Sequence, residues 1–272
     1  LKDYVLKNGF SKVVIGISGG VDSALVAAIS VKALGCSNVL GVAMPSKYNT
    51  ETSNTLAEKL CVNLGIKLKA LPIQELFDLN LNLLHENIFS NLTWDITEEN
   101  LQSRIRSNIL MAISNKMNYM LLSTGNKSEM SMGYSTIYGD LAGGFAPLKD
   151  ITKTMVYKLC TSYNRTNPKN KIPNQIITRE PTAELKHDQK DSDTLPSYEI
   201  LDEVLSLYIE KFWTVNEISN SLSVSKSFVR KIVNSVQRNE FKRRQGPPGV
   251  KVTDISFGKD RRFPITNGFE NF

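Results

Sequence analysis

The chain has 272 residues, 41% of them hydrophobic, so it can bury a large core as one domain or as a domain with an appendage. Three widely spaced cysteines and two distant histidines support neither a disulfide framework, nor a Cys- or His-based metal centre, nor a Ser/His/Asp triad. The net charge of +6 allows either nucleic acid or a polyphosphate small molecule as ligand.

Apolar periodicity predicts alternating strands and helices through the first half of the chain. We expect strands at 12–17, 39–44, 66–71 and 119–123 and helices at 22–34, 50–64, 73 to about 89 and 97–117, the last one capped by Thr97 with Glu99 in its first turn. The β-branched runs suit strands that are buried on both faces. The fold class is therefore α/β, a doubly wound and mainly parallel sheet, followed by a helical C-terminal segment over 197–240.

A glycine loop joins the first predicted strand to the first long helix. It consists of Gly16, Ile17, Ser18, Gly19, Gly20, Val21, Asp22 and Ser23. Gly19 and Gly20 can adopt backbone angles closed to other residues and let the main chain approach phosphate closely, and free N–H groups at a helix start bind phosphate. A carboxylate beside phosphates needs a cation between them, so Asp22 is predicted to be a Mg²⁺ ligand. The alternative is an ordinary turn in which Asp22 only caps the helix.

A second loop, residues 123–145, follows the fourth predicted strand and contains five glycines among polar and aromatic side chains. Ligands of open parallel sheets bind beyond the carboxyl ends of strands, so the two loops are expected to meet over one ligand. Glu129 is then the second carboxylate for Mg²⁺, opposite Asp22. The alternative is a glycine-rich surface loop.

Cys36, Cys61 and Cys160 each fall in an apolar stretch and are expected to be small buried apolar groups. No apolar run reaches the roughly 18 residues that span a bilayer, and no signal-like segment opens the chain. We therefore expect a cytoplasmic protein without a membrane partner.

Residues 213–236 allow a different function. Their apolar spacing predicts two short helices joined by a turn at 221–225, and the second helix is basic. This pattern is typical of a helix-turn-helix, so DNA binding is an alternative, although few side chains on the second helix suit the reading of bases. We do not expect nucleic acid as a partner.

The glycine loop resembles the SGGxDS loop of the N-type ATP pyrophosphatases. Four further stretches, 124–129 with 138–140, 147–153, 181–185 and 239–249, resemble the NAD synthetase family in order and spacing. The resemblance runs from about Val13 to Phe272. The sequence at 133–136 and 242–249 is more similar to the glutamine-dependent branch of the family, in which a separate N-terminal glutaminase domain supplies ammonia.

This resemblance implies an adenine nucleotide alpha-hydrolase-like fold over one synthetase domain, 1–272. It implies that ATP activates the carboxyl group of deamido-NAD as an acyl-adenylate, which ammonia converts to NAD, the last step of NAD biosynthesis. Asp22 and Lys153 then match the catalytic positions; Gly16 to Ser23, Thr124, Lys153 and Thr182 match ATP contacts; Asn100, Arg104, Glu129, Asp140 and Lys242 match contacts to deamido-NAD; and Asp22 with Glu129 match the Mg²⁺ ligands.

Two positions depart from the ammonia-using branch, since Ile137 and Gly144 stand where that branch has a lysine and an aspartate. These contacts are not carried over. No glutaminase domain is expected within this chain, so it should use free ammonium unless a glutaminase domain or subunit supplies ammonia. The resemblance also implies a homodimer, with helix 97–117 as a candidate contact. The nearer alternative is another amidating or tRNA-modifying enzyme that shares the glycine loop.

Overall fold

The centre of the molecule is a parallel sheet. The computed structural model describes residues 1–90, 92–169, 171–187, 189–258, 260–266 and 268. The sheet has four strands in the order β3-β2-β1-β4, with bounds β1 Val13–Gly16, β2 Val39–Ala43, β3 Lys67–Ala70 and β4 Met120–Leu122. The chain runs outward from β1 to β3 and then returns to place β4 on the other side of β1, which confirms the doubly wound parallel α/β fold.

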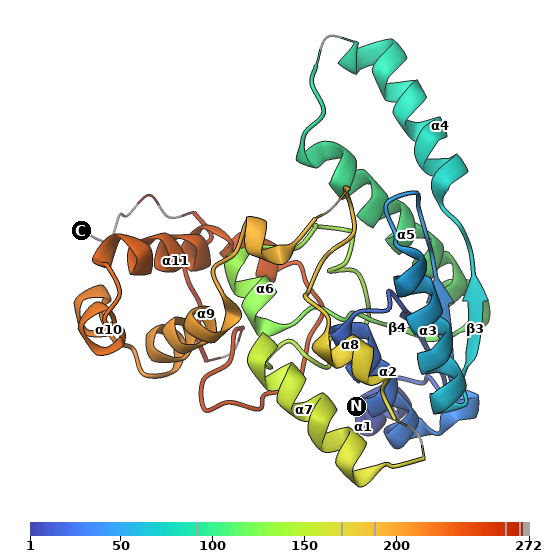
Figure 1. The fold of residues 1–272 in the computed structure, drawn as a ribbon, viewed down its shortest axis with the longest axis horizontal. Coiled ribbons are helices and arrows are strands. Elements are labelled where there is room, and N and C mark those ends of the chain that lie inside the picture. The colour runs from blue at the N-terminus through green and yellow to red at the C-terminus, as the bar shows by residue number, and fades with distance from the viewer. Residues whose placement is uncertain (91, 170, 188, 259, 267, 269–272) are drawn as a thin grey trace.

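Helices connect and surround these strands (Figure 1). The helices of the first half are α1 Lys2–Lys7, α2 Val21–Leu34, α3 Glu51–Leu64, α4 Gln74–Leu84, α5 Ile96–Met117 and α6 Lys127–Met132. Those of the second half are α7 Lys153–Thr166, α8 Asn174–Thr178, α9 Tyr198–Leu205, α10 Val215–Leu222, α11 Lys226–Arg238 and α12 Glu240–Arg243. Short 3₁₀ turns are η1 Cys36–Asn38 and η3 Asp191–Asp193, and π-helical turns are η2 His85–Phe89 and η4 Ser206–Glu210.

The two faces of the sheet carry different layers. Val13 and Ile15 of β1 pack in one core with α2, α3 and α7, whereas Val14 packs in a second core against α5. All three side chains are fully buried, as expected of a central strand covered by helices on both faces. This confirms that β1 has two buried faces.

The prediction of two buried faces was wrong for β3. This strand lies at the edge of the sheet, where Lys67 and Lys69 are exposed and Leu68 packs partly against the core. Exposed lysines are common on edge strands because their charge discourages pairing with another chain. The strand therefore alternates apolar and polar faces, unlike β1.

The start of α5 also differs from the prediction. Asp95, and not Thr97, is the N-cap: its Oδ1 accepts a hydrogen bond from Thr97 N at 2.7 Å, and Glu98 Oε2 accepts from Asp95 N at 2.9 Å. The capping box therefore uses Glu98 rather than Glu99. The helix begins at Ile96, which is two thirds exposed, and α4, η2 and the start of α5 project from the sheet as a helical arm (Figure 1).

The C-terminal helices build a core of their own at one end of the molecule. Residues of α9, α10 and α11, including Leu201, Ile218, Val229 and Ile232, form a buried cluster separate from the two cores beside the sheet. The two helices of the predicted helix-turn-helix are present, with Ser223 in the turn at φ +54° and Ser225 capping α11. No described helix combines the length and hydropathy that crossing a membrane requires.

The expectation for the cysteines holds at two of the three positions. Cys61 and Cys160 are buried, whereas Cys36 is exposed. Cys36 follows Gly35, which ends α2, and so it lies in the short η1 turn outside the helix that would have buried it. The prediction of a buried Cys36 was therefore wrong.

Candidate active site

The glycine loop lies at the carboxyl end of β1 and leads directly into α2. Gly19 has φ +80°, and a Cβ atom there would lie 2.3 Å from the carbonyl oxygen of Ser53, so only glycine fits. Gly20 has φ −89°, an ordinary value, so it does not use a backbone angle closed to other residues. Ser23 Oγ donates to Gly20 O at 3.1 Å and lies 3.1 Å from Ser18 Oγ, which orders the loop around the start of α2.

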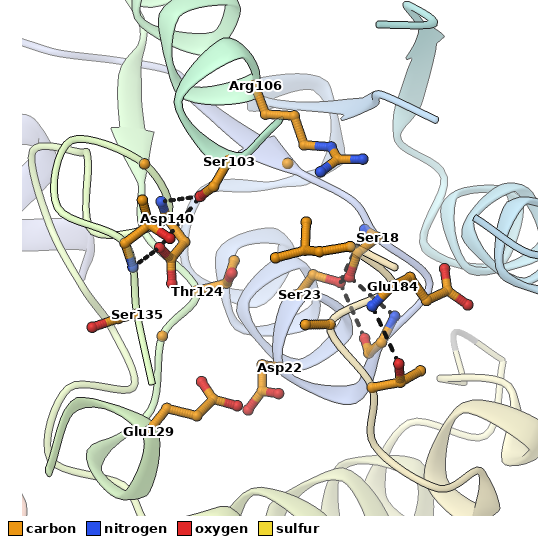
Figure 2. Close-up of a pocket in the computed structure, with 18 of the residues that line it drawn as sticks. Ser18, Asp22, Ser23, Ser103, Arg106, Thr124, Glu129, Ser135, Asp140 and Glu184 are labelled. Atoms are coloured by element: carbon orange, nitrogen blue, oxygen red, sulfur yellow. Dashed lines mark hydrogen bonds between the residues drawn. The ribbon is translucent and has the colours of Figure 1, made fainter. Parts of the chain in front are cut away.

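The second loop meets the first, as expected from the position of β4 beside β1. Asn126 caps α6 by accepting a hydrogen bond from Glu129 N at 3.0 Å, and its Nδ2 donates to Asp22 Oδ1, also at 3.0 Å. One side chain therefore joins the two loops. Figure 2 shows Asp22 and Glu129 approaching each other from these loops.

Lys153, the first residue of α7, bridges the two carboxylates. Its Nζ lies 2.6 Å from Asp22 Oδ2 and 2.9 Å from Glu129 Oε1, and the residue is 3% exposed. Burial alone would lower the pKa of Lys153, but the charges of Asp22 and Glu129 hold it well above its ordinary value. A buried lysine paired with two acids is not the solvated surface lysine that composition alone would suggest.

Desolvation raises the pKa of Glu129 to about 7. The positive charge of Lys153 opposes this rise, while the negative charges of Asp22 and Asp191 add to it. The bridge therefore holds one lysine among several acids in a space with little water. An excess of buried negative charge of this kind favours a further cation.

A cavity of about 390 Å³ lies over the carboxyl ends of β1, β2 and β4, where the strand order reverses. Its lining contains most of the predicted site residues, namely Gly16 to Ser23, Asn100, Thr124, Glu129, Asp140, Lys153, Thr182 and Lys242. Arg104 is the exception, since it is exposed and does not line the cavity.

Asn100, Asp140 and Lys242 also order the second loop. Thr136 Oγ1 donates to Asn100 Oδ1 at 2.7 Å, and Thr136 N donates to Asp140 Oδ1 at 2.5 Å. Lys242 Nζ donates to the carbonyl oxygens of Gly133 at 2.8 Å and Ser135 at 3.0 Å. The loop is thereby held from α5 on one side and from α12 on the other.

Arg104 lies on the same face of α5 as Asn100, as their spacing predicted. Its Nε donates to Ile137 O at 3.2 Å, so it holds the outer part of the second loop. Thr182 Oγ1 donates to Gln189 O at 2.5 Å and orders the segment 179–190, which also contacts α5 through the bond from Gln189 Nε2 to Glu99 Oε2.

The sequence analysis missed several charged residues of the cavity lining, Arg106 and Glu184 among them. Arg106 Nε donates to Met44 O at 3.0 Å, and burial lowers its pKa to about 10, with Glu184 opposing. Glu184 accepts from Asn49 Nδ2 at 2.9 Å and Ser53 Oγ at 2.6 Å, and it joins the segment after β2 to residues 179–190 (Figure 2). For Arg106 a signal existed, because polar residues at 99, 103 and 106 mark one polar face of α5.

The family model for NAD synthase matches residues 1–246. The chain belongs to the NAD synthase family. A glutamine-dependent NAD(+) synthetase of Thermotoga maritima is 51% identical over 274 residues, covering 99% of this chain and 46% of that protein. The chain spans about half the length of the curated relatives it matches.

Solved structures of the family have the same fold. A glutamine-dependent NAD+ synthetase from Acinetobacter baumannii, in complex with ADP, is 40% identical with a TM-score of 0.65, covering 100% of this chain and 48% of that chain. An NMN synthetase from Francisella tularensis is 27% identical with a TM-score of 0.75, covering 89% of this chain and 91% of that one. Because the family match includes α10 and α11, it does not favour the DNA-binding alternative or a tRNA-modifying enzyme.

Proposed function

We propose that this chain carries out the ATP-dependent amidation of deamido-NAD to NAD, the last step of NAD biosynthesis. The observation that carries the proposal is the bridge from Lys153 to Asp22 and Glu129, where two strand-end loops meet over the cavity. A carboxylate is a poor electrophile, so its oxygen must first attack the α-phosphate of ATP. Pyrophosphate leaves, an acyl-adenylate forms, and ammonia then displaces AMP at the carbonyl carbon.

In this proposal the chain supplies position and charge rather than a nucleophile. Backbone N–H groups between Gly16 and Ser23, with the positive end of α2, hold the pyrophosphate that leaves. Lys153, kept protonated by Asp22 and Glu129, offsets the negative charge that develops during transfer. Thr124 and Thr182, which both line the cavity, would contact ATP.

The donor set at the bridge suits Mg²⁺. Asp22 and Glu129 offer carboxylate oxygens. They do not form an all-protein metal site, because among the residues that the structure describes no group of three or more His, Cys, Asp or Glu side chains could hold a metal. Mg²⁺ is commonly held by one or two carboxylates together with substrate phosphates, so these two residues would bind it jointly with ATP. When bound, the ion would neutralise phosphate charge.

For deamido-NAD we propose the second loop and its supports. Asn100, Glu129, Asp140 and Lys242 line the cavity and would contact this substrate. Arg104 would meet it only outside the cavity, from the exposed face of α5. Asp140 pairs with backbone and hydroxyl donors, so its contact would act chiefly through the order of the loop.

We propose ammonia as the nitrogen source of these 272 residues, either as free ammonium or delivered by a glutaminase domain or subunit. The relatives named as glutamine-dependent are about twice as long, which supports a role for such a domain. A cytoplasmic location is proposed because Cys36, Cys61 and Cys160 are all free thiols, as is usual in a reducing compartment.

A homodimer is proposed from the apolar arm formed by α4, η2 and the start of α5. Leu79, Leu83, Ile88 and Ile96 are each about two thirds exposed on this arm. Exposed apolar side chains gathered on one projection are typical of a surface that another chain covers. The start of α5, the helix expected to take part in the contact, belongs to this arm (Figure 1).

The deciding assay measures AMP and pyrophosphate formed from ATP by the purified chain. We expect formation that depends on deamido-NAD and NAD synthesis with ammonium but not with glutamine. Nicotinate mononucleotide, the deamidated form of NMN, serves as the competing substrate. If products form with nicotinate mononucleotide but not with deamido-NAD, the chain is assigned to NMN synthesis. NAD formation from glutamine would refute the proposed nitrogen source.

Asp22→Asn tests the bridge with little change in shape. The variant loses the charge that pairs with Lys153, so we expect pyrophosphate release to fall at least about 100-fold while the protein stays folded. The control is Asp254→Asn, an exposed position outside the cavity, which should remain within about twofold of the parent. Pyrophosphate release by Asp22→Asn within about twofold of the parent would contradict the role of Asp22 in the bridge.

A further inference from the structure

The N-terminus of α7 has no capping side chain of its own. The side chain of its N-cap residue, Thr152, accepts no hydrogen bond from a backbone N–H of the first turn. Yet this turn begins with Lys153, whose ammonium group must remain within hydrogen-bonding distance of two carboxylates. The free N–H groups at the start of a buried helix require acceptors from elsewhere in the molecule.

Two residues from other helices supply those acceptors. Ser128 Oγ, in α6, accepts from Lys153 N at 2.9 Å, and Asp202 Oδ2, in α9, accepts from Thr154 N at 2.8 Å. Ser128 Oγ in turn donates to Asp202 Oδ1. Ser128 is fully buried and Asp202 is 6% exposed, so water does not substitute for these bonds. A carboxylate at a helix N-terminus is also favoured by the helix dipole.

We propose that Ser128 and Asp202 are positioning residues of the adenylation site. These two residues cap α7 from the neighbouring helices α6 and α9, and they thereby hold the Lys153 ammonium group between Asp22 and Glu129. The proposal rests on the proposed role of Lys153. Ser128 directly precedes Glu129 in α6 and accepts the hydrogen bond from Lys153 N, so it adjoins one member of the bridge in the chain and contacts another. α9 begins the C-terminal helical part, and Figure 1 shows it beside α6 and α7.

The geometry sets a narrow tolerance. Lys153 Nζ lies 2.6 Å from Asp22 Oδ2 and 2.9 Å from Glu129 Oε1. A shift of about 1 Å at the first turn of α7 would therefore take Nζ out of hydrogen-bonding range of at least one carboxylate. Displacements of this size at catalytic groups reduce rates by about 100-fold in other enzymes. Helix α9, which does not line the cavity, would thus help to determine whether the site is assembled.

The chain offers a matched control for Ser128. Ser131 is equally buried in the same helix, but its Oγ donates only to the carbonyl of Lys127 in its own helix, at 2.6 Å. Ser128→Ala and Ser131→Ala therefore remove the same atom from the same environment. Only the first substitution removes an acceptor from Lys153 N.

The experiment compares Ser128→Ala, Ser131→Ala and Asp202→Asn in the whole chain. We expect Ser128→Ala and Asp202→Asn to lower kcat for AMP formation at least about 10-fold with KM for ATP within about threefold, and Ser131→Ala to retain kcat within about twofold. Asp202→Asn keeps the shape and one acceptor for Thr154 N, so it should be the milder of the two. Equal losses in Ser128→Ala and Ser131→Ala would overturn the proposal.

A second readout does not depend on activity. Limited acetylation of native protein followed by peptide mass spectrometry should leave the buried Lys153 protected in the parent and in Ser131→Ala, and should modify it in Ser128→Ala and Asp202→Asn. If the parent forms no AMP, the proposed function fails, and this measurement still decides the capping role. Protection of Lys153 in all variants would overturn that role, and if Ser128→Ala fails to fold, Asp202→Asn supplies the comparison.

Discussion

The charge balance around Lys153 is a property of individual residues that pH can probe. Glu129 has a pKa raised to about 7 in the folded chain by burial, against 4.5 as its ordinary value. A folded-state pKa above the unfolded one means that the folded protein holds the proton more tightly. The contribution of Glu129 to the free energy of unfolding is therefore fully present below about pH 4.5 and is lost as the pH rises through about 7.

Glu129→Gln should remove that dependence. Without nucleotide and with a metal chelator, we expect the variant to gain stability relative to the parent by on the order of 1 to 3 kcal/mol between about pH 4.5 and 8. Urea unfolding at a series of pH values measures the difference. Asp140, a buried acid outside the bridge, is common to both proteins and cancels. A difference that does not change with pH would contradict the prediction.

The three cysteines differ in reactivity because they differ in burial. Burial raises the pKa of both Cys61 and Cys160 to about 12, whereas Cys36 is exposed. Since the thiolate is the reacting form, we expect one thiol per native chain to react rapidly with a thiol reagent at about pH 8, and three after denaturation. Cys36→Ser should abolish the rapid phase. A rapid phase that persists in this variant would show that one of the buried thiols is accessible.

At the scale of elements, the start of α5 shows how a cap is misplaced by sequence reasoning. Thr97 precedes a helical pattern and looks like a cap, but Asp95 lies at the N-cap position and completes the box with Glu98. Asp95→Ala should cost about 1 kcal/mol of stability, whereas Thr97→Ala, which removes no capping side chain, should cost less than about 0.5 kcal/mol. Thermal unfolding of the two variants decides between the caps. The reverse order of losses would restore Thr97 as the cap.

The elements that build the site lie far apart in sequence. α5 and the two strand-end loops are each recognisable from local patterns of apolar and glycine residues, whereas α7 was not predicted. The contacts between elements are not recognisable in this way, because the Asn126 to Asp22 and Thr154 to Asp202 bonds join residues 104 and 48 positions apart. A local pattern shows which element forms, and packing decides which elements meet.

At the scale of the whole molecule, the apolar arm makes the proposed dimer testable. Leu79 and Leu83 lie one helical turn apart on α4, and both are mostly exposed. We expect the chain to sediment as a dimer and Leu79→Asp with Leu83→Asp to shift it to a monomer, because two charges would be buried in the contact. Analytical ultracentrifugation measures this, with exposed Val62→Asp as the control. A parent that is monomeric at all concentrations would refute the dimer.

The sequence by itself determined the parallel α/β fold and the glycine loop, since these follow from local spacing and from side-chain chemistry. Its resemblance to the NAD synthetase family supplied most of the predicted residues that line the cavity. The sequence also pointed to Asp22 and Glu129 as partners, because the ends of parallel strands share one edge of the sheet. Only the tertiary structure decided that Lys153 is buried between them, that Arg106 and Glu184 enter the cavity, that Arg104 does not, and that β3 and Cys36 are exposed. Burial and long-range pairing depend on how the layers pack, and no window of local sequence contains that information.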